Sequence, residues 1–379
     1  MKDRSHLVLV GAGHTHLETI SAISEFKEAG KQVTVISTSP YQYYSGMGPG
    51  LLSGFYAPGD VRFNVRRMVE SRGGTFVTDR AASIDADNRL IVLSGGDTVT
   101  YDAASFGVGS EIDTGPLEYD RECMATVKPI EGLNRARLIM EKLLDSVTAR
   151  ILVIGGGAAG VEMAANATMI GKDRPNRPKI TIISRGVILR QFPRRVRNIC
   201  RSMLRRAGVI ILENSMVMSK SSDSLILETG ESVPFHFVLF ATGTRPPAIF
   251  AKSGMPVGET GGLLVNEKLQ CVGHPDVFGG GDCIDFAPRS LAKVGVYAVR
   301  QNRVLKNNLL ASLIGKPLTA FVPQRRYHLA LNMGNGSGIS YRMPLMVTGK
   351  IAFKLKDAID RRFMGKFQEG NEPAGDRAE

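Results

Sequence analysis

The sequence predicts an α/β fold made of two similar units, each a parallel sheet covered by helices, followed by a small C-terminal segment. Two stretches lead to this prediction, because each runs from a short apolar strand through a glycine-rich turn into a helix and a second strand. Glycine is also unusually frequent, at 42 of 379 residues. At about 150 residues per domain, a chain of this length holds two or three domains.

Composition and charge limit the classes of protein that fit. Apolar residues make up 43% and charged residues 22% of the chain, as in soluble globular proteins, which excludes disorder, collagen and coiled coil. The net charge of +12 favours anionic partners, whether nucleotides, phospholipid surfaces or nucleic acid. The four cysteines have no disulfide or zinc spacing, which indicates a reducing compartment. The N-terminus lacks the apolar stretch of a signal peptide, so we expect a cytoplasmic protein.

The first glycine-rich turn is Gly11-Ala12-Gly13-His14-Thr15-His16, between a strand at 6–10 and a helix at 17–29, with the second strand at 32–37. This order is typical of a dinucleotide-binding turn. The first glycine permits the tight turn, and the second lets the backbone approach a pyrophosphate. The helix N-terminus then offers free N–H groups to that anion. His16 replaces the usual third glycine, so the packing of helix on strand must adjust there.

The second turn repeats this layout about 145 residues later. A strand at 150–154 leads into Gly155-Gly156-Gly157-Ala158-Ala159-Gly160, a helix to about residue 171 and a strand at 179–184. Two such units are much stronger evidence than one, and they favour two Rossmann-like dinucleotide-binding domains. Two ordinary glycine-rich turns remain the alternative.

Three further turns end predicted strands. Small residues close the apolar runs at 106–109 and 240–243, where we expect the chain to pass between domains. A third run, at 276–278, leads into Gly279-Gly280-Gly281-Asp282. Gly281 would let the backbone approach a ligand, and Asp282 would accept hydrogen bonds from the ribitol hydroxyls of a flavin. Asp282 as the N-cap of the following helix is a compatible alternative.

Together these motifs resemble the two-dinucleotide-binding-domain flavoproteins of the pyridine nucleotide–disulfide oxidoreductase superfamily. Within it, the chain looks most like the branch of type II NADH dehydrogenases and sulfide:quinone reductases. It is more closely similar to the family found fused to the N-terminus of selenide, water dikinase. The segments that carry this likeness are 9–16, 44–50, 293–301 and 356–364.

The resemblance implies three domains and two cofactors, FAD and NAD(P)H. A discontinuous FAD-binding domain would comprise 1–110 and 240–315, with an NAD(P)-binding domain at 111–239 and a capping segment at 316–379. The residues expected to bind FAD are Gly11, Gly13, His14, Thr15, His16, Ser37, Gly46, Met47, Gly109, Gly281, Asp282 and Lys293. The residues expected to bind NAD(P) are Gly155, Gly157, Ala158, Ala159, Gly160, Glu162, Ser184, Arg185 and Gly243.

The same resemblance implies that two residues act in catalysis. Glu162 stands two residues after the second glycine motif, where an acid of type II dehydrogenases helps to hold the nicotinamide. Its alternative role is to complement the dipole of its helix. Lys293 stands near a helix N-terminus that points at the flavin in sulfide:quinone reductases, where a cation would stabilise an anionic reduced flavin. A surface lysine is the alternative.

The ends of the second strands bear on nucleotide choice. An acid there pairs with a 2′-hydroxyl, whereas its absence together with an arginine suits a 2′-phosphate. The second unit ends in Ser184-Arg185, and residues 185–206 hold eight arginines and no acid, which favours NADPH over NADH. A basic solvated helix face is the alternative for most of these arginines. The first unit ends in Ser37-Thr38 and also lacks the acid, so either hydroxyl groups would hold the FAD ribose or the ribose would be held loosely.

Thiol and metal chemistry are both disfavoured. A disulfide reductase or a sulfide:quinone reductase needs paired cysteines near the flavin. Cys123 has no partner at the expected place, while Cys200, Cys271 and Cys283 are each interpreted as lone small buried residues. No cluster of His, Asp and Glu has metal-ligand spacing, so no metal site is predicted.

The C-terminal stretch 341–368 combines seven basic residues with apolar residues at mostly helical spacing from 349 onward. A basic amphipathic helix of this kind can lie in a membrane interface. Its alternative is a helix packed on the domain with a solvated basic face. Nucleic acid is not expected as a partner because no binding motif accompanies the charge.

The leading hypothesis is an FAD-dependent NAD(P)H oxidoreductase that passes electrons by a ping-pong mechanism to a quinone or another small-molecule acceptor. It would work in the cytoplasm, at the inner face of the cell membrane if the C-terminal helix binds there. One alternative is an oxidoreductase acting on a sulfur or selenium compound. Another is a flavin redox sensor with low turnover, and a homodimer is an open alternative to a monomer.

Overall fold

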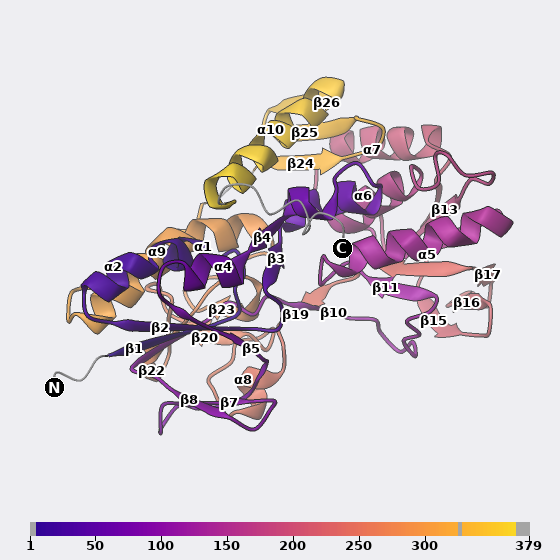
Figure 1. The fold of residues 1–379 in the computed structure, drawn as a ribbon. Helices are drawn as coiled ribbons and strands as arrows, with labels where there is room; N and C mark the ends of the chain where they lie inside the picture. Colours follow the sequence, from indigo (N-terminus) through magenta and orange to yellow (C-terminus); the bar gives the residue numbers. More distant parts are fainter. Residues whose placement is uncertain (1–4, 325–327, 369–379) are drawn as a thin grey trace.

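The computed structural model describes residues 5–324 and 328–368, and its two sheets confirm the predicted α/β fold with Rossmann-like units (Figure 1). The first sheet has eight strands in the order β23-β20-β21-β22-β9-β1-β2-β5, and β22, β9, β1, β2 and β5 run parallel. Its strands are β1 (His6–Val10), β2 (Gln32–Ser37), β5 (Thr75–Thr78), β9 (Ala103–Phe106), β20 (Leu263–Val265), β21 (Gln270–Cys271), β22 (His274–Gly279) and β23 (Ile284–Phe286).

The second sheet has five strands, all parallel, in the order β11-β18-β12-β13-β14. They are β11 (Met124–Thr126), β12 (Arg150–Ile154), β13 (Lys179–Ser184), β14 (Ile210–Glu213) and β18 (Phe237–Phe240). The strands are nearly continuous apolar runs because both faces of a parallel sheet are covered. Val153 and Phe237, for example, are fully buried.

Strands β1 and β12 occupy matching places in the two sheets. Strand β2 lies on one side of β1 and β9 on the other, while β13 and β18 flank β12 in the same way. Each position is therefore a topological switch point, where ligands of open α/β sheets bind at the carboxyl ends of the strands.

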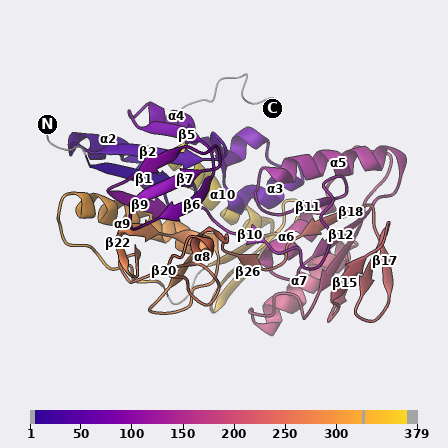
Figure 2. The same ribbon diagram turned by 90° about the horizontal axis from the view of Figure 1, so that it is seen from below.

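Helices cover both sheets (Figures 1 and 2). The predicted helix at 17–29 is divided at Ala22 into two, and the helix predicted to run to 171 ends at Ala167. The helices before the C-terminal segment are α1 (Leu17–Ser21), α2 (Ile23–Glu28), α3 (Gly48–Leu52), α4 (Val65–Glu70), α5 (Gly132–Ser146), α6 (Ala158–Ala167), α7 (Arg194–Arg206), α8 (Ile249–Lys252) and α9 (Gly295–Leu313). Short 3₁₀ turns are η1 (Ser45–Met47), η2 (Pro58–Val61) and η3 (Gly281–Cys283).

Small antiparallel pieces complete the two units. The paired strands β10 (Glu111–Ile112) and β19 (Thr244–Arg245) lie where the chain crosses between the sheets, directly after the two predicted crossing turns. The others are β3 (Tyr41–Tyr43), β4 (Arg62–Asn64), β6 (Ala81–Asp85), β7 (Leu90–Leu93), β8 (Thr98–Thr100), β15 (Val217–Lys220), β16 (Ser224–Leu227) and β17 (Ser232–Pro234).

The C-terminal segment contacts both units. It consists of β24 (Leu329–Asn332), β25 (Gly338–Arg342), β26 (Leu345–Gly349) and α10 (Lys350–Phe367), drawn in yellow in Figure 1. Strand β24 packs on α6 of the second unit, and α10 reaches β4 of the first. Among residues 5–324 and 328–368, none of the helices has the length and apolarity needed to span a bilayer.

Candidate active site

The first glycine-rich turn lies against the end of the neighbouring strand β9. Gly11 has φ +86°, and a Cβ atom on it would lie 2.6 Å from the carbonyl oxygen of Gly107. A Cβ atom on Gly13 would lie 2.9 Å from the same oxygen. Neither position has space for a side chain, so the backbone of this turn stays bare, as the approach of a pyrophosphate requires.

The side chain of His16 is buried beneath this turn and forms a hydrogen bond with it. Its side chain is fully buried, with Nδ1 at 2.5 Å from the Gly11 carbonyl oxygen and Nε2 at 2.8 Å from Ser105 Oγ. Burial lowers the pKa of His16 to about 4, so the ring is neutral. Both ring nitrogens are bonded within the protein. The role expected for His16 therefore changes from a cofactor contact to a support of the turn.

Three turns meet at the carboxyl ends of β1, β9 and β22. We call residues 11–16, 107–110 and 280–283 the junction loops. Thr15 lies between the other two, because a Cβ atom on Gly107 would lie 2.7 Å from its Oγ1 and one on Gly280 would lie 2.8 Å from its Cγ2. Gly281 has φ +79°, and its N–H donates to the buried side-chain oxygen of Gln301 at 2.7 Å.

His14 holds an unpartnered polar atom at this junction. Its Nε2 is buried and forms no hydrogen bond with the described residues. Burial lowers the pKa of His14 to about 4, with a weaker opposing effect of Asp282. A buried polar group without a partner costs free energy unless a ligand supplies one. The bare glycine turn and this free ring nitrogen together fit a bound flavin dinucleotide.

Asp282 is paired with a lysine of the second unit. Lys128, two residues after β11, places its Nζ 2.6 Å from Asp282 Oδ2 and 2.9 Å from Ser110 Oγ. Ser110 also donates to Asp282 at 3.1 Å. This carboxylate therefore has protein partners, and Lys128 joins the two units beside the junction loops. No sequence pattern distinguished Lys128, because its contact with Asp282 spans 154 residues.

Lys293 lies differently from the expectation. Its Nζ donates to the carbonyl oxygen of Ile284 and lies 3.0 Å from Asp285 Oδ1. The charge of the Lys293 ammonium group is thus balanced by Asp285, so it does not offer the flavin an unpaired cation. Helix α9 instead reaches the junction loops through Gln301.

The remaining residues expected at FAD have different surroundings. Met47 is 1% exposed, so its side chain belongs to the core and not to a binding surface. Ser37 ends β2 and is partly exposed, while a Cβ atom on Gly109 would meet open space. The carbonyl oxygen of Gly46 accepts a hydrogen bond from Lys356 Nζ at 2.5 Å.

The second glycine turn repeats the geometry of the first. Gly155 has φ +126°, and a Cβ atom on it would lie 2.2 Å from the carbonyl oxygen of Ala241, which follows β18. One on Gly160 would lie 1.8 Å from the carbonyl oxygen of Gly155. Gly157, in contrast, is exposed with nothing within 4 Å of its Cβ position. It precedes α6, whose first residues Ala158 and Ala159 are partly and fully exposed, so the helix N-terminus is open to an anion.

The end of β13 has the composition expected for a 2′-phosphate. Ser184 is buried against Gly156, while Arg185 is exposed. The nearest strand end, on β14, carries Glu213, but its carboxylate accepts from the Ile188 N–H at 2.7 Å and from Arg201 at 2.7 Å. Gly243 is exposed after β18, with open space at its Cβ position.

Glu162 faces the C-terminal segment. Its Oε1 accepts the N–H of Asn332 at 2.7 Å. Burial raises the pKa of Glu162 to about 7, although the nearby ammonium of Lys356 opposes the shift. A carboxyl group in this range can gain or lose a proton near neutral pH.

Helix α10 contributes a buried ion pair that the sequence did not reveal. Lys356 Nζ lies 2.6 Å from Asp360 Oδ2, and Asp360 Oδ1 accepts from Tyr44 at 3.1 Å. Phe363 stacks on Tyr44 at 4.6 Å and on His14 at 6.0 Å between ring centroids. The helix thus connects the first glycine turn with the surroundings of Glu162. Segment 356–364 was recognised only as a family likeness and as part of an amphipathic pattern.

The cysteines do not form a thiol pair. All four are free, and burial raises the pKa of Cys283 to about 11 and that of Cys200 to about 12. Cys123 is partly buried, and burial together with Asp120 raises its pKa as well. Thiolates, the reactive form, are therefore disfavoured at each of these positions.

Residues 5–302 match the family model described as pyridine nucleotide-disulphide oxidoreductase. The chain belongs to this family. Membership supports an oxidoreductase and confirms the predicted cofactors, FAD and NAD(P)H. The narrower likeness to the family fused to selenide, water dikinase stays a prediction.

Relatives in the family include proteins named for quinone reduction. The chain is 22% identical over 392 residues to the type II NADH:quinone oxidoreductase of Staphylococcus saprophyticus, covering 96% of each chain. It is 25% identical over 350 residues to human ferroptosis suppressor protein 1, covering 88% of this chain and 87% of that one. The fold is shared with the sulfide:quinone oxidoreductase of Aquifex aeolicus, at a TM-score of 0.79 and 19% identity, over 98% of this chain and 94% of that one.

Two glycines of the second turn, Gly160 and Gly157, are expected to respond differently to substitution by alanine. Gly160→Ala places a methyl group against the Gly155 carbonyl and should lower stability by about 1–3 kcal/mol, seen as a lower Tm. Gly157→Ala meets open space and should leave Tm nearly unchanged. It should weaken NAD(P)H binding on the order of tenfold, because the backbone can no longer approach the pyrophosphate. Equal effects of both variants on Tm would contradict the geometry.

The raised pKa of Glu162 predicts that the difference in stability between the wild type and a Glu162→Gln variant depends on pH. Its pKa rises from 4.5 to about 7 on folding, so the native chain keeps a proton that the unfolded chain releases first. The contribution of this group to stability therefore falls as pH rises through that window. Glu162→Gln removes the effect. We therefore expect the Tm of the variant to rise relative to that of the wild type as pH increases from 4.5 to about 7. A Tm difference that is constant across this range would show that burial does not shift this carboxyl.

Proposed function

We propose that this chain is an FAD-dependent NAD(P)H oxidoreductase that reduces a quinone-type acceptor. The observation that carries the proposal is the placement of α10. Its Lys356 bonds to Gly46 of the first unit, and the same ammonium acts on Glu162 of the second. Residues of the first unit, the second unit and the C-terminal segment therefore lie around one ammonium group. Two relatives are named for quinone reduction, which supports the choice of acceptor.

The junction loops would hold FAD. The bare backbone of Gly11 and Gly13 suits the pyrophosphate, and the open position of Gly109 suits close contact with the cofactor. His14 Nε2 would find its missing hydrogen-bond partner there. Asp282, already held by Lys128, would accept from ribitol hydroxyls with its orientation fixed.

The second glycine turn would hold NAD(P)H. Gly155, Gly157 and Gly160 shape the turn, and the exposed N-terminus of α6 suits the pyrophosphate. Arg185 stands free at the end of β13 with no acid beside it on that strand. This arrangement favours NADPH, since an arginine pairs with a 2′-phosphate.

Bound FAD would supply the redox chemistry, taking a hydride from NAD(P)H and giving two electrons to the acceptor, which would also need two protons to become a quinol. The protein must supply at least one proton close to the acceptor. Glu162, with its pKa of about 7, is protonated in a fraction of the molecules at neutral pH. Lys356 is held by Asp360 and Gly46, so its ammonium group would keep a fixed position beside the site.

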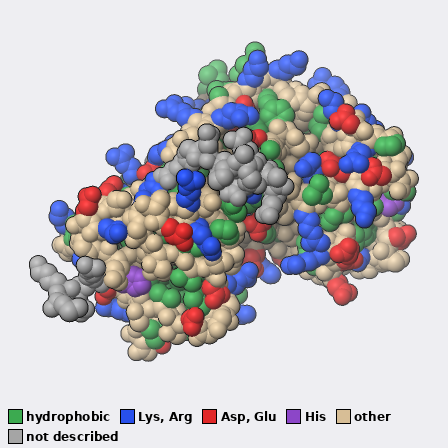
Figure 3. All heavy atoms as spheres, viewed as in Figure 1, with side chains coloured by type: hydrophobic (Ala, Val, Ile, Leu, Met, Phe, Trp, Pro, Cys, Tyr) green, Lys and Arg blue, Asp and Glu red, His purple; other side chains and the backbone are tan. Residues whose placement is uncertain are grey.

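We further propose that the chain binds the cytoplasmic face of a membrane, where a lipid-soluble quinone is available. Apolar side chains project from the C-terminal segment, and we call them the apolar ridge: Met343, Leu345, Val347, Ile351, Leu355 and Ile359. Ile351 is 72% and Leu345 74% exposed. Figure 3 shows hydrophobic side chains projecting at the top of the molecule with basic ones around them. Exposed apolar residues flanked by basic ones suit a bilayer interface.

An anaerobic titration tests the reaction. NADPH should bleach the flavin absorption of the FAD-loaded protein faster than NADH, and a short-chain quinone should restore it. Arg185→Asp should lower the NADPH/NADH ratio of kcat/KM by about tenfold, because a carboxylate repels the 2′-phosphate.

Each contrary result of this titration points elsewhere. No bleaching by either nucleotide would remove the hydride donor and leave sulfide or selenide to be tried as reductants. Bleaching that no quinone reverses would contradict the acceptor and favour a low-turnover sensor. An unchanged nucleotide ratio in the variant would contradict the role of Arg185.

The apolar ridge predicts a specific loss of membrane binding. Ile351→Ser with Leu355→Ser should weaken sedimentation with lipid vesicles by more than about tenfold, since each buried apolar side chain contributes about 1.5–3 kcal/mol. Leu138→Ser is a matched control, because Leu138 is 52% exposed on α5, away from the ridge. Undiminished binding of the double variant, or an equal loss in the control, would refute the ridge as the contact.

A further inference from the structure

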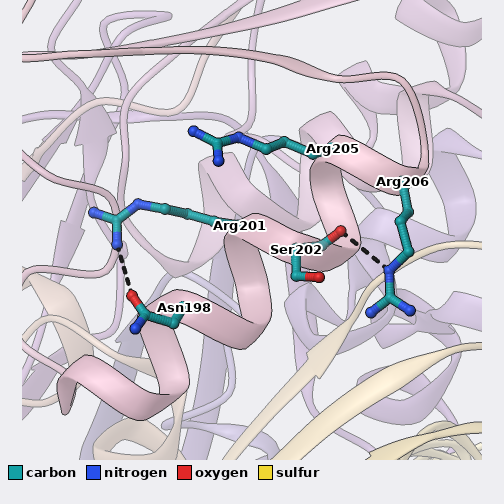
Figure 4. A pocket seen from close by; sticks show the side chains of 5 residues that line it. All are labelled: Asn198, Arg201, Ser202, Arg205 and Arg206. Carbon is teal, nitrogen blue, oxygen red and sulfur yellow. Dashed lines mark hydrogen bonds between the residues drawn. The ribbon is translucent and has the colours of Figure 1, made fainter.

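Helix α7 carries a basic surface whose residues are not among those assigned above to the cofactors or the acceptor. Val196, Cys200 and Leu204 recur every four residues and are buried against the second sheet. The outward side has a surface hollow of about 460 Å³. Its lining residues, seen in Figure 4, are Asn198, Arg201, Ser202, Arg205 and Arg206.

The three arginines differ in their partners, although the charges of both Arg201 and Arg205 act on Glu213. Arg201 is bound through its guanidinium to Glu213 at 2.7 Å and to Asn198 at 3.2 Å. Arg205 and Arg206 are exposed, and neither forms an ion pair with any carboxylate of the described residues. Arg206 donates to the backbone oxygen of Ser202 at 3.3 Å. Guanidinium forks with hydroxyl and amide groups beside them suit the oxygens of a phosphate.

The end of the hollow that Arg205 and Arg206 line lies away from the glycine turn of the second unit, although Arg201 reaches back to Glu213. In a β-α-β unit the helix runs antiparallel to the strands, so its C-terminus lies at their amino ends. Arg205 and Arg206 end α7 only a few residues before β14 begins at Ile210. The glycine turn at 155–160 follows the carboxyl end of β12, at the opposite edge of the same sheet.

The hollow lies on the same side of the molecule as the apolar ridge. Figures 1 and 2 both place α7 beside the sheet of β24, β25 and β26. In Figure 3 basic side chains continue from the ridge at the top over the region of α7. A surface that meets a bilayer through the ridge would thus bring the end of α7 to the level of the lipid headgroups.

We propose that Arg205 and Arg206, with Ser202 and Asn198, bind the phosphate groups of anionic phospholipids as a second membrane contact beside the ridge. The inference rests on the proposed membrane binding and adds a requirement for anionic lipid. Apolar burial alone gives marginal attachment, and a basic patch is the second signal that makes it stable. Charge complementarity argues for this occupant, because the chain carries a net charge of +12.

The test uses full-length protein and sedimentation with vesicles of phosphatidylcholine, with or without phosphatidylglycerol. Each basic side chain near an anionic surface contributes about a factor of five to partitioning. Arg205→Gln with Arg206→Gln should therefore weaken binding to the anionic vesicles by about 25-fold, and leave binding to neutral vesicles unchanged. Substituting both by Lys should restore most of the binding, since the charge returns.

The matched control removes the same charge elsewhere. Arg135 and Lys142 are exposed on α5, and Figure 2 shows the strands of the second sheet between α5 and α7. Arg135→Gln with Lys142→Gln should bind anionic vesicles nearly as the wild type does. An equal loss of binding to anionic vesicles in both double variants would show that only the net charge matters, and would overturn the proposal.

Further outcomes separate this proposal from its alternatives. Unchanged binding of the α7 pair, with loss in the ridge variant, would overturn the α7 contact and leave the ridge intact. Competition by inorganic phosphate beyond that of chloride at equal ionic strength would indicate a free-phosphate site and overturn the lipid assignment. An altered rate of flavin reduction by NADPH in the α7 pair would assign these arginines to the nucleotide instead. Vesicle binding is measured without turnover, so failure of quinone reduction would leave the result interpretable.

Discussion

Both glycine-rich turns depend on the same contact, in which a backbone carbonyl oxygen lies directly against a glycine. The Gly107 oxygen lies where a side chain on Gly11 or Gly13 would start, and the Ala241 oxygen lies in the same way against Gly155. Each carbonyl belongs to the turn after the strand that flanks β1 or β12 at the switch point. Sheet order thus fixes the position of each turn, and the absence of a Cβ atom lets the backbone reach it.

The two units use the oxygen of their first glycine differently. In the second unit, Gly160 approaches the Gly155 oxygen so closely that a methyl group would clash at 1.8 Å. Five residues after Gly11, His16 meets the equivalent oxygen through a ring nitrogen at 2.5 Å. A hydrogen bond therefore replaces close helix packing at this position. Ser105 holds the far side of the ring, so the larger residue is accommodated without an unpaired polar atom.

Local features of this chain could be predicted from sequence, and contacts between distant residues could not. The strands, both turns and the absence of an acid after Ser184 depend on neighbouring residues, whose spacing is visible in the chain. The pairing of Lys128 with Asp282 spans 154 residues, and that of Tyr44 with Asp360 spans 316. Lys293 was expected to be free at the flavin because its partner Asp285, eight residues away, gives no pattern in one sequence.

The orientation of α10 was the least predictable feature, and it restricts what the helix can do. Spacing showed an amphipathic helix, but the buried side includes the charged pair Lys356 and Asp360, while Ile351 and Leu355 face outward. Turning the helix to bury this apolar stripe would break the hydrogen bonds of Lys356 to Gly46 and Asp360. A buried charge that loses its partners costs several kcal/mol, about as much as the stripe would gain by burial. The stripe therefore remains outside, where a surface beyond this chain can cover it while the ion pair stays in place.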